Sequence, residues 1–236
     1  METRLTPLRE TPIGDPAEIR RRAGRDGYLF FRGLVDPPAV AALLGRVREQ
    51  CAARRFSTGD RARAGLLPIP FDDPDFVALQ CVVLATPEFA AVGDAPALLG
   101  VLGDLYGRPV RTRRGDLCRI AVPGHPDRAT PPHQDHHYVG GSPEIWTAWL
   151  PLTDCPLELG PLVVLPGSHR GGARPHGVAA AGVEGVAVED GAVWAGGDLA
   201  AGDALLFSSL TIHRSLPNRT ADRLRLSVDY RYEPAT

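Results

Sequence analysis

From residue 108 onward, the sequence alternates between short apolar runs and turn residues. The runs are rich in β-branched and aromatic residues, and Pro, Gly, Asn and Asp separate them, which is typical of strands joined by tight connections. Strands are predicted at 111–122, 133–139, 145–150, 162–165, 204–208, 211–214 and 224–232. Seven or eight short strands of this kind predict an antiparallel jelly roll, either as two packed sheets or as a closed barrel.

The residues before 108 are predicted to be mostly helical. Asp15-Pro16 and Asp36-Pro37 each place a capping residue before Pro at the first helical position, and a third helix is expected to start at Asp94-Ala95-Pro96. A short strand is expected at 28–32, and the stretch 55–75, rich in Gly, Pro and Asp, is expected to be a long loop.

These patterns together predict one domain spanning residues 1–236. It is expected to be mainly β with flanking helices, with a mostly helical part at 1–107 and a jelly-roll core at 108–236. The segment 171–202, rich in Ala and Gly, is long for a connection between strands, and such loops often bind ligands.

Composition limits the function classes. The formal net charge of -2 gives no electrostatic reason to expect nucleic acid or an anionic membrane surface as a partner. All 26 basic side chains are Arg. The absence of Lys excludes a Schiff-base lysine and the phosphate-binding lysine of a P-loop.

The chain carries no sequence signal for export or for disulfides. The first residues are charged, and no apolar run approaches the ~18 to 20 residues of a membrane span, so a cytoplasmic protein is expected. Cys51, Cys81, Cys118 and Cys155 are widely spaced and form no CxxC pair, which predicts buried reduced thiols.

The segment 129–141, ATPPHQDHHYVGG, contains three of the seven histidines. If it is a strand, His133 and Asp135 lie on one face, close enough to hold one metal ion. His137 shares that face, so geometry alone does not choose between the histidines; it is a candidate for orienting a ligand.

A third ligand candidate is His213, near the end of a short apolar strand in the segment LTIHRSLPN. Two imidazoles and one carboxylate form the facial triad of non-haem Fe(II) enzymes, which leaves three positions for a chelating cosubstrate and O2. Zinc is the competing metal, because the same ligands suit a catalytic zinc hydrolase. The HExxH helix common in such hydrolases is absent.

The C-terminal segment RLRLSVDYRY contains a candidate anion site. Arg225 and Ser227 share a strand face, twelve and fourteen residues after His213. A buried carboxylate, such as the far end of 2-oxoglutarate, needs a fixed bidentate cation with a hydroxyl beside it. Arg223 has the same parity as Arg225 and is the second candidate.

Four segments together resemble the phytanoyl-CoA hydroxylase (phytanoyl-CoA dioxygenase) family of Fe(II)/2-oxoglutarate-dependent oxygenases: HQDHHY, WTAWLPL, GPLVVLPGSHRGG and HRSLPNRTADRLRLS. The resemblance runs from about residue 27 to residue 232 and implies a double-stranded β-helix that binds Fe(II), 2-oxoglutarate and O2. It also implies specific roles: His133, Asp135 and His213 as iron ligands, Arg225 as the cosubstrate anchor, and Ser215 and Trp149 as pocket residues; Ser227 is added to the pocket by its shared strand face with Arg225.

The chain departs from this family in one respect. Some members use a lysine on an earlier strand to help hold the cosubstrate, and this chain has none. Arg119 and Asp116, both on the strand predicted at 111–122, are the candidates to replace it.

The predicted function is a dioxygenase that oxidises a C–H bond of a small metabolite, by hydroxylation or oxidative ring closure. The resemblance favours bacterial natural-product biosynthesis, such as that of a sugar-containing antibiotic. The many Arg and Asp residues of the loops 55–75 and 171–202 favour a polar substrate. A metal-dependent hydrolase and a non-catalytic jelly-roll binding protein remain as alternatives, and the oligomeric state stays open.

Overall fold

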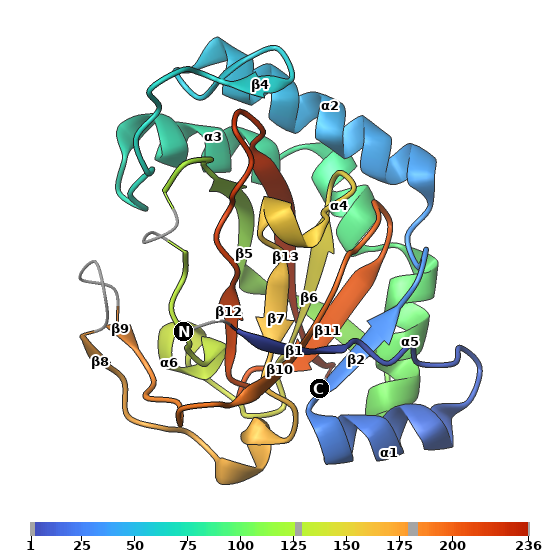
Figure 1. Ribbon diagram of the computed structural model, residues 1–236. Helices are drawn as coiled ribbons and strands as arrows, with labels where there is room; N and C mark the ends of the chain where they lie inside the picture. The colour runs from blue at the N-terminus through green and yellow to red at the C-terminus, as the bar shows by residue number, and fades with distance from the viewer. Residues whose placement is uncertain (1–2, 126–128, 179–183, 236) are drawn as a thin grey trace.

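Two β-sheets face each other at the centre of the protein (Figure 1). The computed structural model describes residues 3–125, 129–178 and 184–235. The strand order is β2-β11-β6-β13-β5 in the larger sheet and β1-β10-β7-β12 in the smaller one. The strands are β1 (Arg4–Pro7), β2 (Tyr28–Phe31), β5 (Val110–Ala121), β6 (Trp146–Pro151), β7 (Leu162–Val164), β10 (Val193–Gly196), β11 (Ala204–Ser208), β12 (His213–Ser215) and β13 (Arg225–Pro234). The predicted jelly roll is confirmed.

Each strand of the larger sheet alternates between two cores. Its inner side chains pack between the sheets, as Phe30, Trp149 and Phe207 do. Its outer side chains pack under the helices, as Trp146 and Val228 do. This period-two alternation is what a sheet covered on both faces requires, and it places Trp146 and Trp149 on opposite faces.

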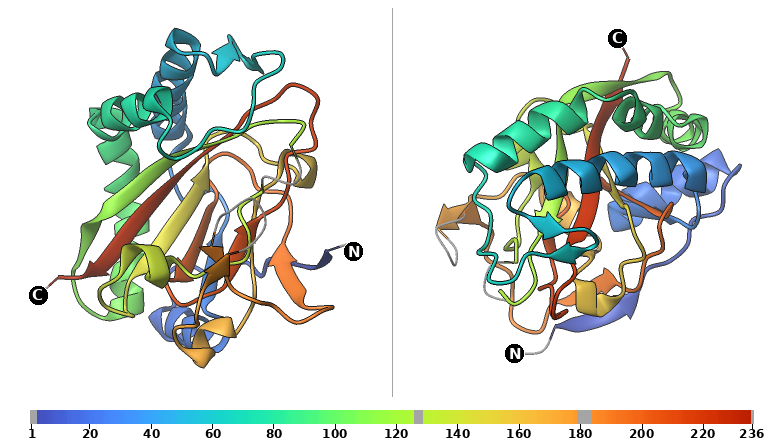
Figure 2. Two further views of the ribbon diagram at one scale, coloured as in Figure 1. Left: turned by 90° about the vertical axis from the view of Figure 1, so that its left-hand side faces the viewer. Right: turned by 90° about the horizontal axis from the view of Figure 1, so that it is seen from above.

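Helices cover the outer face of the larger sheet (Figure 2). They are α1 (Pro16–Asp26), α2 (Pro37–Ala53), α3 (Pro74–Leu84), α4 (Pro87–Gly93) and α5 (Pro96–Tyr106). The sequence prediction missed α3 and α4. Both have the usual start signal: Asp73 and Thr86 accept hydrogen bonds from the first turns, with Pro following each.

The segment predicted as a strand at 133–139 is instead the short helix α6 (Asp135–Val139), so that prediction was wrong. Only His133 keeps a β-type pairing, an isolated antiparallel bridge to His213. Short elements also occupy the expected loops: β3 (Ser57–Thr58), β4 (Arg61–Ala62), η2 (Leu157–Leu159), η3 (Ser168–Gly171), β8 (Gly177–Val178) and β9 (Glu184–Gly185).

The two sheets take strands from both parts of the chain. β1 pairs in parallel with β10 in the smaller sheet, and β2 pairs with β11 in the larger. The region before residue 108 therefore does more than supply the covering helices, because its strands β1 and β2 each complete one edge of a sheet.

One apolar segment, Pro87–Tyr106, passes the length and hydropathy criteria for a membrane-spanning helix, contrary to the sequence prediction. It is divided into α4 and α5. Its apolar side chains Phe89, Val92, Leu98 and Leu102 are buried in the core under the larger sheet, and this packing accounts for its apolar character.

Three of the four cysteines are buried, as predicted. Cys81 is exposed on α3, so for that residue the prediction was wrong. All four are free thiols.

Candidate active site

His133 and His213 face each other inside the jelly roll. Their backbones exchange two hydrogen bonds of 3.0 Å, and their ring centroids lie 4.1 Å apart. Nδ1 of His133 donates to the carbonyl of Pro131 (2.8 Å), and Nδ1 of His213 donates to that of Thr211 (3.0 Å). Since a carbonyl oxygen only accepts, these bonds hold the proton on Nδ1 and leave the lone pair of each Nε2 free for a metal.

Asp135 completes a group of three from the start of α6. Its Oδ1 lies 3.8 Å from Nε2 of His133 and 3.6 Å from Nε2 of His213. The three ligand atoms lie within 4.8 Å of one another, and all three residues are buried. Two imidazole nitrogens and one carboxylate oxygen at this spacing suit a facial triad. The residues chosen from sequence thus converge, although the strand that was expected to align two of them is absent.

The surroundings of His133 and Asp135 keep both side chains in the protonation state that can bind a metal ion. Burial, with His213 close by, lowers the pKa of His133 to about 3, so its imidazole is neutral at physiological pH. Burial opposes the charged form of Asp135, but Arg231 and the two histidines hold the pKa of its carboxyl well below the usual range. The site therefore offers the neutral imidazole of His133 beside the carboxylate of Asp135.

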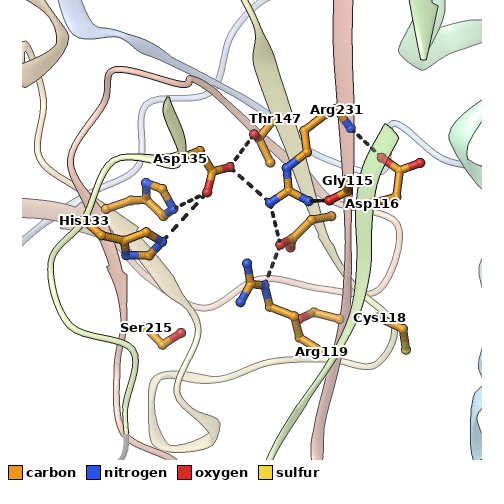
Figure 3. Close-up of polar contacts among 12 residues, drawn as sticks. Gly115, Asp116, Cys118, Arg119, His133, Asp135, Thr147, Ser215 and Arg231 are labelled. Carbon is orange, nitrogen blue, oxygen red and sulfur yellow. Dashed lines mark hydrogen bonds and ion pairs between the residues drawn. The ribbon is translucent and has the colours of Figure 1, made fainter. Parts of the chain in front are cut away.

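The second oxygen of Asp135 is occupied by protein donors (Figure 3). Oδ2 accepts a hydrogen bond from the Thr147 hydroxyl (2.6 Å) and one from Nη2 of Arg231 (3.3 Å). The sequence analysis identified neither donor. A usable signal was present for one of them, because Arg231 has the same strand parity as Arg225.

The buried guanidinium of Arg225 forms the second part of the candidate site. It is 3% exposed, donates to the hydroxyls of Ser227 (2.7 Å) and Ser215 (3.3 Å), and forms no ion pair with a carboxylate of the described residues. Its Nε and the Nε1 of buried Trp149 have no hydrogen-bond partner. Burial lowers the pKa of this guanidinium, but not enough to neutralise an arginine.

A buried cation without a counter-ion is costly, so this environment suits an anionic ligand. A dicarboxylate such as 2-oxoglutarate fits: one carboxylate would be held by the guanidinium and two hydroxyls, with its other end toward the triad. The residues predicted to contact it, Arg225, Ser227, Ser215 and Trp149, are all brought together here.

A cavity of about 130 Å³ opens beside this cation. Its walls include Arg225, Ser215 and Arg119, with the apolar side chains Ile69 and Phe71 opposite. The three metal-ligand candidates lie outside its lining, so the cavity belongs to the arginine end of the site.

The structure separates the alternatives that the sequence left open. Arg223 is half exposed and pairs with Glu158 (2.7 Å), away from the interior, because β13 begins only at Arg225. Asp116 accepts a hydrogen bond from the backbone of Arg231 (2.9 Å), whereas Arg119 lines the cavity. Of the two candidates to replace a lysine, only Arg119 is placed to do so.

His137 does not contact a metal-ligand candidate among the described residues. Its Nε2 lies 2.6 Å from Glu184, and its ring stacks on His176 at 4.0 Å. The expected role in orienting a ligand is therefore wrong.

Gln134 fills a position that the sequence analysis missed. It is 1% exposed and anchors the segment after η3. Its Nε2 donates to the carbonyls of Gly172 (2.9 Å) and Leu210 (2.6 Å), and its Oε1 accepts from the backbone of Arg174 (2.8 Å). The residue between two ligand candidates thus fastens the 171–202 insertion to the site.

Comparison with solved structures supports the fold. The non-heme alpha ketoglutarate dependent epimerase SnoN from nogalamycin biosynthesis aligns with a TM-score of 0.66, at 24% identity over 94% of this chain and 85% of SnoN. EvdO2 from Micromonospora carbonacea var. aurantiaca, solved with 2-oxoglutarate, aligns with a TM-score of 0.62, at 22% identity over 97% of this chain and 95% of EvdO2.

Sequence comparison extends to characterised enzymes. Two 1-deoxypentalenic acid 11-beta-hydroxylases, from Streptomyces arenae and Streptomyces exfoliatus, are each 28% identical to this chain, covering 96% of it and 84% of their own length. A profile of the phytanoyl-CoA dioxygenase (PhyH) family matches residues 23–226, a span that contains the triad and Arg225. The predicted enzyme class is thereby confirmed, and the chain belongs to the phytanoyl-CoA dioxygenase (PhyH) family.

Proposed function

We propose that the protein is an Fe(II)/2-oxoglutarate-dependent dioxygenase in which His133, Asp135 and His213 bind iron and Arg225 anchors the cosubstrate. One observation carries this assignment. A buried guanidinium without a carboxylate partner among the described residues shares the jelly-roll interior with a buried His-Asp-His group. A hydrolase that uses a redox-inert metal has no need of that cation.

When bound, iron and 2-oxoglutarate supply the oxidation of a C–H bond by O2, with the cosubstrate converted to succinate and CO2. The protein's own residues orient and hold these groups. Each Nδ1–H bond aims an Nε2 lone pair at the metal position, and Ser227 and Ser215 complete the donors around the cosubstrate carboxylate. Arg119 lies on the same cavity wall and is paired with Asp229 (2.5 Å).

The substrate side of the cavity favours a small molecule with an apolar surface. The residues 67–71, here called the apolar rim, include Leu67 and Phe71, which are 69% and 60% exposed, and Phe71 lines the cavity. Several charged residues of the same loop are paired with each other or with neighbours, as in Arg55 with Asp73 and Arg61 with Asp222. These paired charges, which favoured a polar substrate from sequence alone, are thus compensated within the protein.

Natural-product biosynthesis is the proposed context, with hydroxylation as the favoured outcome. The relatives named as hydroxylases act on 1-deoxypentalenic acid, and SnoN belongs to an antibiotic pathway. Ring closure on a sugar-containing antibiotic is the second candidate. We propose a cytoplasmic location, a small-molecule substrate and no nucleic-acid or membrane partner.

The test is anaerobic addition of Fe(II) and then 2-oxoglutarate to metal-free protein, followed by visible absorption. A charge-transfer band that needs His213 and weakens in Arg225→Ala supports the proposal, and succinate release then screens substrates. If no band appears and zinc is retained instead, the oxygenase assignment is wrong and hydrolase assays take its place. If neither metal binds, the chain is a non-catalytic binding protein.

A further inference from the structure

The inner face of β13 carries four polar side chains in alternation: Arg225, Ser227, Asp229 and Arg231. All four are at most 3% exposed. The proposed function uses only the first two. A fully buried guanidinium at the far end of the strand, 2% exposed, requires compensation by charge and hydrogen bonds, and its partners indicate what it does.

A bulge in the neighbouring strand holds Arg231 from one side. The pairing of β13 with β5 shifts register between Asp229 and Arg231, so that β5 accommodates extra residues. Gly115, in this bulge, has a φ of 116°, which favours glycine, and its carbonyl accepts a hydrogen bond from Nη1 of Arg231. Asp116 binds the backbone N–H of Arg231 at 2.9 Å. Two consecutive bulge residues therefore fix both the backbone and the side chain of one arginine.

The other side of the guanidinium faces Asp135. Its Nη2 lies 3.3 Å from Oδ2, the oxygen that also accepts from Thr147 at 2.6 Å. With Oδ2 engaged twice, only Oδ1 faces the two histidines. This orientation presents one carboxylate oxygen to the metal position, whereas a carboxylate free to rotate could offer both and occupy a further coordination position.

Beyond the contact between Arg231 and Asp135, positively and negatively charged side chains continue to alternate (Figure 3). Nη2 of Arg231 also lies 3.5 Å from Oδ2 of Asp229, and the same oxygen accepts from Nε of Arg119 at 2.5 Å. The row Asp135, Arg231, Asp229, Arg119 is balanced in charge. The negative charge of Asp229 compensates part of the positive charge of Arg231 and helps to hold its guanidinium in place. Asp135 therefore does not balance that charge alone.

We propose that Arg231, held by the β5 bulge, is the positioning residue that limits Asp135 to a single metal-binding oxygen. The inference rests on the proposed function, since it takes Asp135 as a ligand. In this proposal Arg231 does not contact substrate or cosubstrate, and it acts only by orienting the carboxylate of Asp135.

Co(II) titration of metal-free protein, followed by its visible absorption, tests the proposal, because affinity and band shape report the ligand set. Arg231→Gln is expected to weaken Co(II) binding by about 10- to 100-fold, the range found for groups that orient metal ligands, and to change the band. Arg231→Lys keeps the charge without the planar fork. Its Co(II) affinity is expected to lie between those of Arg231→Gln and wild type. Arg111→Gln is the matched control, since Arg111 lies on β5 but pairs with Glu233 at the surface.

Unchanged affinity and band shape in Arg231→Gln would overturn the proposal. If that variant does not fold, the same result in Arg231→Lys would overturn it. Failure of the wild type itself to bind Co(II) would instead contradict the proposed function.

A stability cycle in metal-free protein separates positioning from a purely structural role. If Arg231 acts on Asp135, adding Asp135→Asn to Arg231→Gln restores part of the lost thermal stability, because the carboxylate that lost its cationic partner is no longer buried as an unpaired charge. If rescue comes only from Asp229→Asn, Arg231 serves Asp229 alone and the proposal is wrong.

Discussion

The guanidinium of Arg225 lies beside the indole of Trp149, 5.9 Å from Cζ to the ring centroid, and both side chains keep a buried N–H without a partner. Two unused donors at one buried point define where an anion can be held. They also make the site unfavourable when empty, because a cation has been removed from water without a counter-charge.

Arg225→Gln is therefore expected to have opposite effects on binding and on stability. Loss of charge-assisted bonds predicts about 10- to 100-fold weaker 2-oxoglutarate binding, measured by titration of the Fe(II) protein. The cosubstrate-free protein should melt at the same or a higher temperature. Arg223→Gln, an exposed control, should leave both unchanged; an equal loss there would contradict the assignment of Arg225.

Removal of metal should destabilise the protein only while the triad is intact. Fe(II) or Co(II) at a hundred-fold excess over Kd adds about 2.7 kcal/mol to the free energy of unfolding, seen as a rise in Tm that EDTA reverses. In His213→Ala this rise should vanish. A rise that persists would place the metal elsewhere.

The pH dependence of stability in metal-free protein should show two opposing contributions. His133 has a folded pKa of about 3, so between this value and its ordinary pKa near ~6.5 the unfolded state binds more protons, and stability falls as the pH falls. Burial raises the pKa of Asp116 to about 6. The folded state then binds more protons between ~3.8 and 6, and stability rises as the pH falls.

Single variants separate these contributions, each on the order of a few kcal/mol at full extent. Asp116→Asn should make the acid loss of stability between pH 6 and pH 4 steeper, and His133→Asn should make it shallower. Urea unfolding across this range measures both. Parallel curves for the two variants and wild type would show that neither group titrates as described.

The apolar rim should bind apolar ligands. Phe71→Ser is expected to weaken an anilinonaphthalene sulfonate dye by roughly 10-fold, from the lost burial of one aromatic side chain, measured by fluorescence titration. Ile13→Ser is the control, because Ile13 is 63% exposed but does not line the cavity. Equal weakening in both variants would mean that the dye binds elsewhere.

Gln134→Ala should loosen the insertion and the metal site together. Three side-chain hydrogen bonds are lost, each worth about 1 kcal/mol, and trypsin should cleave faster after Arg170 or Arg174. Gln50→Ala, which removes a hydrogen bond to Arg54 on α2, is the control. Unchanged proteolysis would show that Gln134 does not anchor this segment.

The sequence predicted those features that depend on local pattern. Val40, Leu43, Leu44, Val47 and Cys51 recur at helical spacing, which predicts one buried face of α2, and all but the partly buried Leu44 are buried. The parity of Arg225 with Ser227 placed both inside the jelly roll. The helix starts at Pro74 and Pro87 had the required capping signals and were overlooked.

Other features depend on tertiary geometry. His133 and Asp135 converge because a helix starts between the sheets, which strand parity cannot predict. The partnership of Arg231 with Asp135 depends on a bulge in β5, a strand that lies more than a hundred residues away from Arg231 in sequence. No pattern within either segment contains that information.

The described residues of the insertion are held to the segment of the metal-ligand candidates at several points: His176 accepts a hydrogen bond from the backbone N–H of Gln134 (3.1 Å), and Glu184 lies 2.6 Å from His137. Gly172 and Arg174 are tied to Gln134, and the backbone N–H of Val186 donates to the carbonyl of Pro132 (2.7 Å). The described residues of this segment, which include β8 and β9, are therefore tied to the part of the chain that carries His133 and Asp135. Because these contacts hold the segment beside the proposed iron ligands, substitutions within it can change which molecules reach the metal without replacing a ligand.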